Sequence, residues 1–154
     1  MLKVNFYENI ETNNMETNNI EIKDNIIPDI KDLVSIYNDA GWSNYTNNID
    51  MLKLAYNNSL KIVSLWDGSK LIGIIRVVGD GYSIIYIQDL IILTEYKKQG
   101  LGSKLIKYVM NTYKDVYQKV LLTENQESTT KFYESCDFVS SDKYGCVAFV
   151  KFNM

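Results

Sequence analysis

The chain has 154 residues, of which 46% are hydrophobic and 23% charged, and its formal net charge is −3 at pH 7. This length suits one domain with a core of ordinary size, and so small a charge argues against a general nucleic-acid binder. Histidine is absent, which excludes a Ser-His-Asp triad, a Cys-His dyad and any zinc site with a histidine ligand. Cys136 and Cys146 are too few for an all-thiolate zinc site, so we expect no metal.

The sequence also carries no sign of export or membrane insertion. No stretch approaches the roughly 20 apolar residues of a membrane-spanning helix, and the N-terminus lacks the basic start and apolar run of a signal peptide. Two cysteines in a chain of this size favour reduced thiols. We therefore expect a cytoplasmic protein with no membrane partner.

The first part of the chain is polar and then becomes helical. We interpret residues 1–19 as an N-terminal extension, with at most a short strand at Leu2–Tyr7, and residues 20–154 as a single domain. Alternating apolar and polar residues predict a strand at 20–23. Pro28 suits a first helical turn, and apolar residues at helical spacing follow it until Gly41. A second helix is expected at 49–57.

The middle of the chain is rich in β-branched residues. Strands are expected at 61–66 and 71–78, joined by a turn, because both runs are flanked by glycine-containing turn sequences. The run 83–93 is apolar almost throughout, which is typical of a central strand buried on both faces. An amphipathic pattern then predicts a helix at 101–117. The last elements expected are a strand at 120–123, a helix at 128–136 and strands at 138–140 and 145–152.

The segment between the buried strand and the amphipathic helix, Lys97-Lys-Gln-Gly-Leu-Gly-Ser103, has the features of an anion site. Glycines allow close approach to the backbone, and successive N–H groups at the start of a helix face outward with the positive end of the helix dipole. Residues 97–119 carry six lysines against one acid, Asp115, so a weakly acidic chain has a local positive patch. The loop matches neither a Walker A motif nor a dinucleotide fingerprint. A tight turn that merely begins a helix is the structural alternative.

Two motifs of this sequence are similar to those of one known family. Residues 90–106, which include Lys97, Gly100 and Gly102, resemble the acetyl-CoA-binding motif of the GNAT N-acetyltransferases. Downstream, Lys131-Phe-Tyr-Glu-Ser-Cys-Asp-Phe138 resembles that family's Phe-Tyr-Glu segment. The resemblance covers roughly residues 20–152. It implies an α/β fold with a central, mixed and mostly antiparallel sheet, splayed between strands 4 and 5 and flanked by helices.

The resemblance also implies a cosubstrate, acetyl-CoA, and residues that would bind it. The end of the fourth strand would contact the pantetheine arm, and the following loop would bind the pyrophosphate through backbone N–H groups. The acetyl-CoA-binding residues implied are Leu90, Ile91, Ile92, Lys97, Lys98, Gln99, Gly100, Leu101, Gly102, Ser103 and Gln126. The sequence departs from the family pattern at three places: Lys97 replaces Gln or Arg, Gln126 replaces an asparagine, and Cys136-Asp137 replaces leucine-glycine.

The same resemblance maps the family's catalytic tyrosine onto Tyr133, which would protonate the departing CoA thiolate. A phenol with an ordinary pKa of about 10 is protonated at neutral pH and suits that role. A strand N–H near Ile91 would stabilise the developing oxyanion. Without histidine, the general base falls to Asp89, Tyr86 or a water chain. Asp89 is a carboxylate in an otherwise apolar strand, which is costly unless it is paired or functional.

For the acceptor, the sequence offers an aromatic pair and one arginine. Trp42 and Tyr45 follow the first predicted helix, and together with Arg76 they resemble a subgroup of small bacterial GNAT proteins and plant arylalkylamine-type acetyltransferases. This predicts direct acetyl transfer to a small primary amine, with a homodimer as a family-level expectation. Two other interpretations stay open: a non-catalytic acyl-CoA-binding sensor or regulatory module, and a nucleotide-binding fold.

Overall fold

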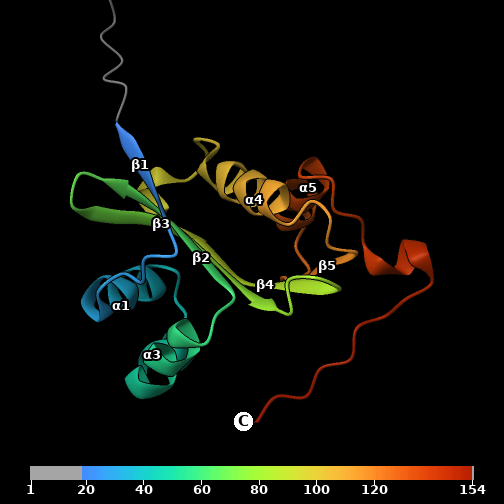
Figure 1. Ribbon diagram of the computed structural model, residues 1–154, viewed down its shortest axis with the longest axis horizontal. Coiled ribbons are helices and arrows are strands. Elements are labelled where there is room, and N and C mark those ends of the chain that lie inside the picture. Colours follow the sequence, from blue (N-terminus) through green and yellow to red (C-terminus); the bar gives the residue numbers. More distant parts are fainter. Residues whose placement is uncertain (1–18, 154) are drawn as a thin grey trace, which may run out of the picture.

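The computed structural model describes residues 19–153 and shows a five-stranded sheet (Figure 1). The strands follow one another across the sheet in chain order. They are β1 (Ile20–Asp24), β2 (Lys61–Asp67), β3 (Lys70–Gly79), β4 (Ile84–Ile92) and β5 (Gln118–Leu121). Every neighbouring pair is antiparallel except β4 and β5, which run parallel. The expected mixed, mostly antiparallel sheet is therefore confirmed.

Helices cover both faces of this sheet, with α1 and α3 on one side and α4 and α5 on the other (Figure 1). The helical elements are α1 (Ile30–Asp39), α2 (Ser43–Thr46), α3 (Ile49–Asn57), the 3-10 turn η1 (Thr94–Tyr96), α4 (Leu101–Thr112), α5 (Glu127–Ser135) and the 3-10 turn η2 (Ser141–Tyr144). Because β3 lies between two covered faces, its side chains from Leu71 to Val77 are buried throughout. This explains why its sequence shows little polar alternation.

The sheet opens where β4 and β5 meet. Their pairing begins at Ile84 opposite Gln118 and ends at Ile87 opposite Leu121, so the rest of β4 has no β5 partner. On its other edge, β4 pairs Asp89 with Arg76 but Ile87 with Val77, which leaves Gln88 as a bulge. A bulge re-aims the side chains beyond it. The expected splay between strands 4 and 5 is thus confirmed, and it exposes one edge of β4 from Gln88 onward.

Several predicted boundaries were wrong. The helix expected to reach residue 117 ends at Thr112, because the chain leaves the helical conformation at Tyr113. Beyond it, the Lys119 ammonium donates to the carbonyls of Lys114 and Val116. The fifth strand begins two residues earlier than expected, at Gln118. The short helix α2 was not predicted; a single turn carries too few residues for a periodic signal.

The two last predicted strands, at 138–140 and 145–152, do not form in the structure. Most of the side chains that follow Phe138 are exposed, and the segment beyond η2 leaves the body of the protein (Figure 1). A strand needs a neighbouring strand to satisfy its backbone groups, and this segment has none within the described residues. The possible strand at Leu2–Tyr7 lies outside the described residues.

Three further observations concern membrane insertion, metal binding and the cysteines. Within residues 19–153, no helix is both long and apolar enough to cross a membrane. The same residues contain no group of three or more side chains arranged to hold a metal ion. Both cysteines are free thiols: Cys136 is buried, and Cys146 is exposed.

Candidate functional site

The loop from β4 to α4 has an unusual backbone. Lys98 and Gly100 both adopt left-handed conformations, with φ of +62° and +77°. Such a conformation costs a residue with a Cβ about 1–2 kcal/mol, so it is normally left to glycine. Two left-handed residues in so short a stretch turn successive N–H groups toward one side, as in anion-binding nests. The side chains of Lys97 and Lys98 are exposed beside it.

Within residues 19–153, only one N–H group of the loop 97–103 has an acceptor: the Lys97 N–H donates to the Thr94 carbonyl at 3.3 Å. The first backbone bond of α4 runs from the Lys104 N–H to the Gly100 carbonyl at 3.0 Å. Within the described part of the chain, the N–H groups of residues 98–103 have no hydrogen-bond acceptor. Unpaired N–H groups at a helix start, together with the positive end of its dipole, bind phosphate or another anion.

The beginning of α4 is packed closely against α5. A Cβ on Gly102 would lie 3.1 Å from Phe132 Cζ, so a side chain at this position would press on the phenyl ring. Next to it, the Cys136 thiol donates to Ser103 Oγ at 3.9 Å. We call residues 97–103 the anion loop. Small residues at the contact therefore let the anion loop pack directly against α5.

Tyr133 lies on α5 in an aromatic cluster. Its ring centroid is 5.0 Å from that of Phe132 and 6.0 Å from that of Phe138. Burial raises the pKa of Tyr133 to about 12, partly offset by a hydrogen bond with Thr123. Thr123 follows β5, so the Tyr133 hydroxyl faces the segment that leaves the splay in the sheet. The phenol is protonated over the whole neutral and mildly alkaline range.

Asp89 lies on β4 inside a buried polar cluster on the opposite face of the sheet. The carboxylate is 1% exposed. Its Oδ2 accepts from Arg76 Nε at 2.6 Å and from the Tyr37 hydroxyl at 2.7 Å. The Tyr37 hydroxyl also shares a 3.0 Å hydrogen bond with the Tyr56 hydroxyl. The second carboxylate oxygen, Oδ1, is buried and has no partner in the described structure.

The electrostatics of this cluster follow from its burial. Burial, with a further contribution from the negative charge of Asp89, raises the pKa of both Tyr37 and Tyr56 well above the usual value. Burial by itself lowers the pKa of Arg76, but the adjacent Asp89 outweighs it and raises the pKa overall. The cluster thus holds two neutral phenols around one ion pair. An unpaired buried oxygen costs about 1–3 kcal/mol in such a setting, which marks Oδ1 as a position for a ligand.

Aromatic side chains next to the cluster come from α2 and the residue before it. The Tyr37 ring centroid lies 5.9 Å from that of Trp42 and 5.1 Å from that of Tyr45. Gln88, the bulged residue, donates through Nε2 to the Tyr45 hydroxyl at 3.1 Å. Burial raises the pKa of Tyr45, and the negative charge of Asp89 adds to this effect. Tyr45 is thus half-buried and close enough to Asp89 to respond to its charge.

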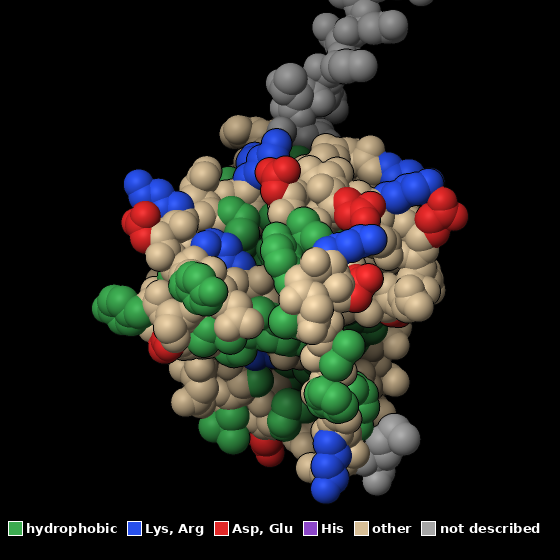
Figure 2. Space-filling view, turned by 90° about the vertical axis from the view of Figure 1, so that its right-hand side faces the viewer, with side chains coloured by type: hydrophobic (Ala, Val, Ile, Leu, Met, Phe, Trp, Pro, Cys, Tyr) green, Lys and Arg blue, Asp and Glu red, His purple; other side chains and the backbone are tan. Residues whose placement is uncertain are grey.

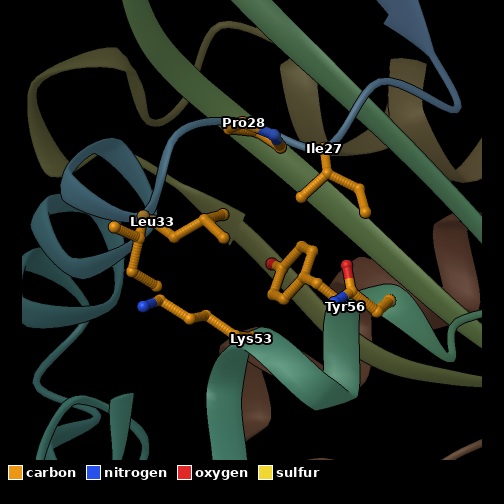
Figure 3. A pocket seen from close by; sticks show the side chains of 7 residues that line it. Ile27, Pro28, Leu33, Lys53 and Tyr56 are labelled. Carbon is orange, nitrogen blue, oxygen red and sulfur yellow. The ribbon is translucent and has the colours of Figure 1, made fainter. Parts of the chain in front are cut away.

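A small cavity of about 140 Å³ lies between α1 and α3, on the far side of the same cluster (Figure 3). In this view the side chains of Leu33 and Tyr56 face each other across it, and Lys53 extends toward α1. The lining residues are Ile27, Pro28, Ile30, Leu33, Lys53, Tyr56 and Asn57. Tyr56 is the side chain that this cavity shares with the polar cluster, so the cavity is not part of the anion loop.

Comparison with known proteins identifies the fold. The model of the acetyltransferase (GNAT) domain matches residues 29–153. The chain belongs to the GNAT acetyltransferase family. A protein of Prochlorococcus marinus named as an uncharacterized N-acetyltransferase, ycf52-like, is 30% identical over 125 residues, which cover 79% of this chain and 68% of that protein.

Solved structures agree with the GNAT assignment. A GNAT-family acetyltransferase from Streptococcus pneumoniae is 38% identical, with a TM-score of 0.79, and the match covers 87% of this chain and 98% of the other. A probable acetyltransferase from meticillin-resistant Staphylococcus aureus is 25% identical, with a TM-score of 0.72, covering 86% and 99% of the two chains. This protein is therefore an acyltransferase by family, with the α/β fold that its sequence predicted.

The structure of this GNAT protein divides the predicted site residues into two groups. The loop residues from Lys97 to Ser103 lie together at the start of α4, next to the free edge of β4 that includes Leu90, Ile91 and Ile92. Asp89 and Arg76 lie together on the other face, near Trp42 and Tyr45. Gln126 occupies the N-cap position of α5 without a side-chain capping hydrogen bond, and it is exposed.

Sequence reasoning missed three residues of this GNAT site. Tyr37 and Tyr56 lie in predicted helices with no site role assigned to them, although the Tyr37 hydroxyl donates to Asp89 and shares a hydrogen bond with the Tyr56 hydroxyl. Gln88 was not singled out, because a bulge in a strand leaves no mark in an apolar run. The signal that would have found the tyrosines is their chemistry: a buried tyrosine hydroxyl needs a partner. Asp80, by contrast, accepts hydrogen bonds from the N–H groups of Tyr82 and Ser83 and so holds the turn before β4.

Proposed function

We propose that the protein is an acetyl-CoA-dependent N-acetyltransferase that transfers the acetyl group directly to a small primary amine with a hydrophobic or aromatic body. The observation that carries the proposal is the row of unbonded N–H groups at residues 98–103, beside the unpaired edge of β4. Family membership supports the reaction class. The free thiol of the exposed Cys146 is consistent with a reducing, cytoplasmic environment.

The residues present fit acetyl-CoA, which supplies the activated acetyl group. The N–H groups of Lys98 to Ser103 would hold the pyrophosphate, with the Lys97 and Lys98 ammonium groups at its edge. The backbone of Leu90, Ile91 and Ile92 would bind the pantetheine amides, because this edge of β4 has no strand partner. Gln126, at the start of α5, would contribute a polar contact near the loop.

Asp89 would act as the base for the acceptor. An amine is mostly protonated at neutral pH, and it must lose a proton before it attacks a thioester. Oδ1 of Asp89 is free to accept that proton, while Arg76 and Tyr37 hold Oδ2. Because the carboxylate is 1% exposed, we propose that the Tyr45 hydroxyl or a water molecule passes the proton to it. In this proposal Arg76 orients the Asp89 carboxylate through its hydrogen bond to Oδ2 and does not contact the acceptor.

Tyr133 would act as the acid, and its hydroxyl would donate a proton to the departing sulfur. The raised pKa, about 12, keeps the proton on the phenol until a stronger base appears. The backbone N–H near Ile91 would stabilise the negative charge that develops on the carbonyl oxygen. Trp42 and Tyr45 would form the aromatic wall of the acceptor pocket, since their rings cluster with Tyr37 beside Asp89.

A panel of amines tests this function. Release of CoA thiol from acetyl-CoA is measured with arylalkylamines, polyamines, amino acids and peptide N-termini, and the products are identified by mass spectrometry. We expect at least one amine to raise thiol release well above the amine-free rate, with one acetylated amine formed per CoA. If acetyl-CoA binds but no amine raises the rate, the proposal fails and a non-catalytic acyl-CoA sensor explains the fold.

A further inference from the structure

The cavity between α1 and α3 has an apolar interior of the size of one aromatic ring. Its volume is about 140 Å³, and an engineered apolar cavity of about 150 Å³ in another protein binds benzene. Leu33 and Tyr56, each 1% exposed, face each other across it (Figure 3). Pro28, also buried, lies at the same wall as Leu33 in this view. The interior therefore suits a small flat apolar group.

Two polar side chains of α3 line the same cavity. Lys53 and Asn57 are four residues apart and so share one face of the helix, and both are exposed. Within residues 19–153 neither side chain makes an ion pair or a side-chain hydrogen bond, whereas that of Asn58 donates to the Leu54 carbonyl. No carboxylate lines the cavity. An ammonium and an amide that are both free to donate suit the two oxygens of a carboxylate.

Tyr56 makes one wall of this cavity rigid. Its hydroxyl shares a 3.0 Å hydrogen bond with the Tyr37 hydroxyl, and the Arg76 guanidinium carbon lies 5.5 Å from its ring centroid. The ring is thus held through both its hydroxyl and its π system. A wall fixed before binding loses little conformational freedom when a ligand arrives. Contact with an aromatic ligand would add an aromatic pair to the apolar burial.

Exposed apolar side chains elsewhere on the molecule do not offer this combination. Hydrophobic side chains gather in the lower half of the face seen in Figure 2, which lies on the side of β5 and η2. Phe149 and Phe152 in the C-terminal segment are 92% and 74% exposed, so they are open to solvent rather than enclosed. The cavity between α1 and α3 instead joins an enclosed apolar space to a few polar groups, as small-molecule sites do.

We propose that this cavity is a binding site for a small aromatic carboxylate. The ring of the ligand lies between Leu33 and Tyr56, and its carboxylate accepts from Lys53 and Asn57. The site is separate from the proposed acceptor pocket: it lies beside the first turns of α1, whereas the aromatic pair of that pocket follows the last turn. The charge also differs, because the Lys53 ammonium repels a protonated amine.

Titration of the ¹⁵N-labelled full-length chain with benzoate tests the site. We expect the amide signals of residues 30–33 and 53–57 to move with a Kd of roughly 1 mM, as for other ligands of this size. Lys53→Gln keeps a long polar side chain without its charge and should raise this Kd about fivefold. Lys107→Gln, at an exposed lysine on α4 across the sheet, is the matched control and should leave the Kd unchanged.

Two further ligands separate the cavity from its charged rim. Acetate has the carboxylate without the ring, and benzamide has the ring without the charge, so each should bind at least about fivefold more weakly than benzoate. The proposal is overturned if benzoate moves no signals in these two segments, if acetate or benzamide binds as tightly as benzoate, or if the two lysine variants weaken binding equally. All these readouts measure binding, so they are independent of any acetyl transfer by the protein.

Discussion

At the scale of single residues, the proposed acetyl transfer depends on the hydrogen bonds that hold Asp89. A buried carboxylate is tolerated when paired, and Arg76 and Tyr37 supply that pairing through a single oxygen. The second oxygen remains free to accept a proton. In the proposed mechanism, one oxygen of Asp89 is thus held by its structural partners and the other accepts the proton of the acceptor.

Asp89→Asn tests the proposed base. The amide keeps an oxygen for Arg76 and Tyr37 but cannot accept the proton, so we expect kcat/KM at pH 7 to fall by roughly 10²–10⁴-fold. Activity should recover as pH rises, because solution then supplies more of the neutral amine. Steady-state kinetics across pH measure both effects, and the exposed Asp115→Asn serves as control. A folded Asp89→Asn enzyme with wild-type kinetics would exclude this base.

Tyr133→Phe tests the proposed acid. Loss of the hydroxyl should lower kcat by about 10²-fold, while the Kd for acetyl-CoA stays unchanged, because the ring and its aromatic contacts are kept. Since the pKa of Tyr133 is raised to about 12, wild-type kcat should show no alkaline decline from this group up to pH 10. Tyr117→Phe, at a side chain 93% exposed, is the control. Unchanged thiol release by Tyr133→Phe would contradict the assignment.

At the scale of elements, the site depends on the contact between α4 and α5. Gly102 lets the start of α4 approach Phe132, and this places the free N–H groups beside the helix that carries Tyr133. Gly100 and Lys98 supply the left-handed turns that aim those N–H groups. The conformation of the anion loop thus depends on the left-handed backbone at Lys98 and Gly100 and on the packing of Gly102 against Phe132.

Gly102→Ala tests the packing constraint. The new methyl group would lie 3.1 Å from Phe132 Cζ, and overpacking of this kind costs about 1–3 kcal/mol. We expect the Kd for acetyl-CoA to rise by about 10-fold, measured by titration calorimetry. In the Phe132→Leu background the effect of Gly102→Ala should largely disappear, because the ring that it presses on is gone. An equal effect in both backgrounds would show that Phe132 is not the cause.

The sequence predicted the elements that repeat a local pattern. The apolar run of β4, the glycines of the loop and the Phe132-Tyr133 pair were all visible as short motifs. The hydrogen bond from Tyr37 to Asp89 could not be predicted from a local motif. It joins residues 52 positions apart and depends on a bulge at Gln88. The predicted strand at 145–152 was wrong for the single chain, since alternation shows that a segment can form a strand but not which strand it would pair with.

At the scale of the whole molecule, the buried phenols couple folding to alkaline pH. The pKa values of Tyr37 and Tyr56 are raised by burial in the folded protein, whereas unfolded tyrosines ionise near pH 10. Above that pH the folded state holds more protons than the unfolded state. The free energy of unfolding must therefore fall as pH rises past 10, and it is unaffected by these groups below pH 9.

Tyr37→Phe tests this coupling. The variant should lose about 1 kcal/mol at pH 7, because Asp89 loses a donor, and its stability should decline less steeply than that of the wild type above pH 10. Urea unfolding followed by circular dichroism at several pH values measures both. Tyr82→Phe, at a side chain 88% exposed, should leave the slope unchanged. Parallel wild-type and Tyr37→Phe curves would show that this phenol does not contribute.

The most direct test of the account is a single-turnover reaction with acetyl-CoA labelled in the acetyl group. Enzyme is mixed with the labelled acetyl-CoA and a reactive amine, the reaction is quenched, and protein and product are weighed by mass spectrometry. We predict labelled N-acetylated amine with no acetyl group on the protein at any time point. Label that appears first on the protein, or acetyl-CoA that stays intact beside every amine tested, would contradict direct transfer at this site.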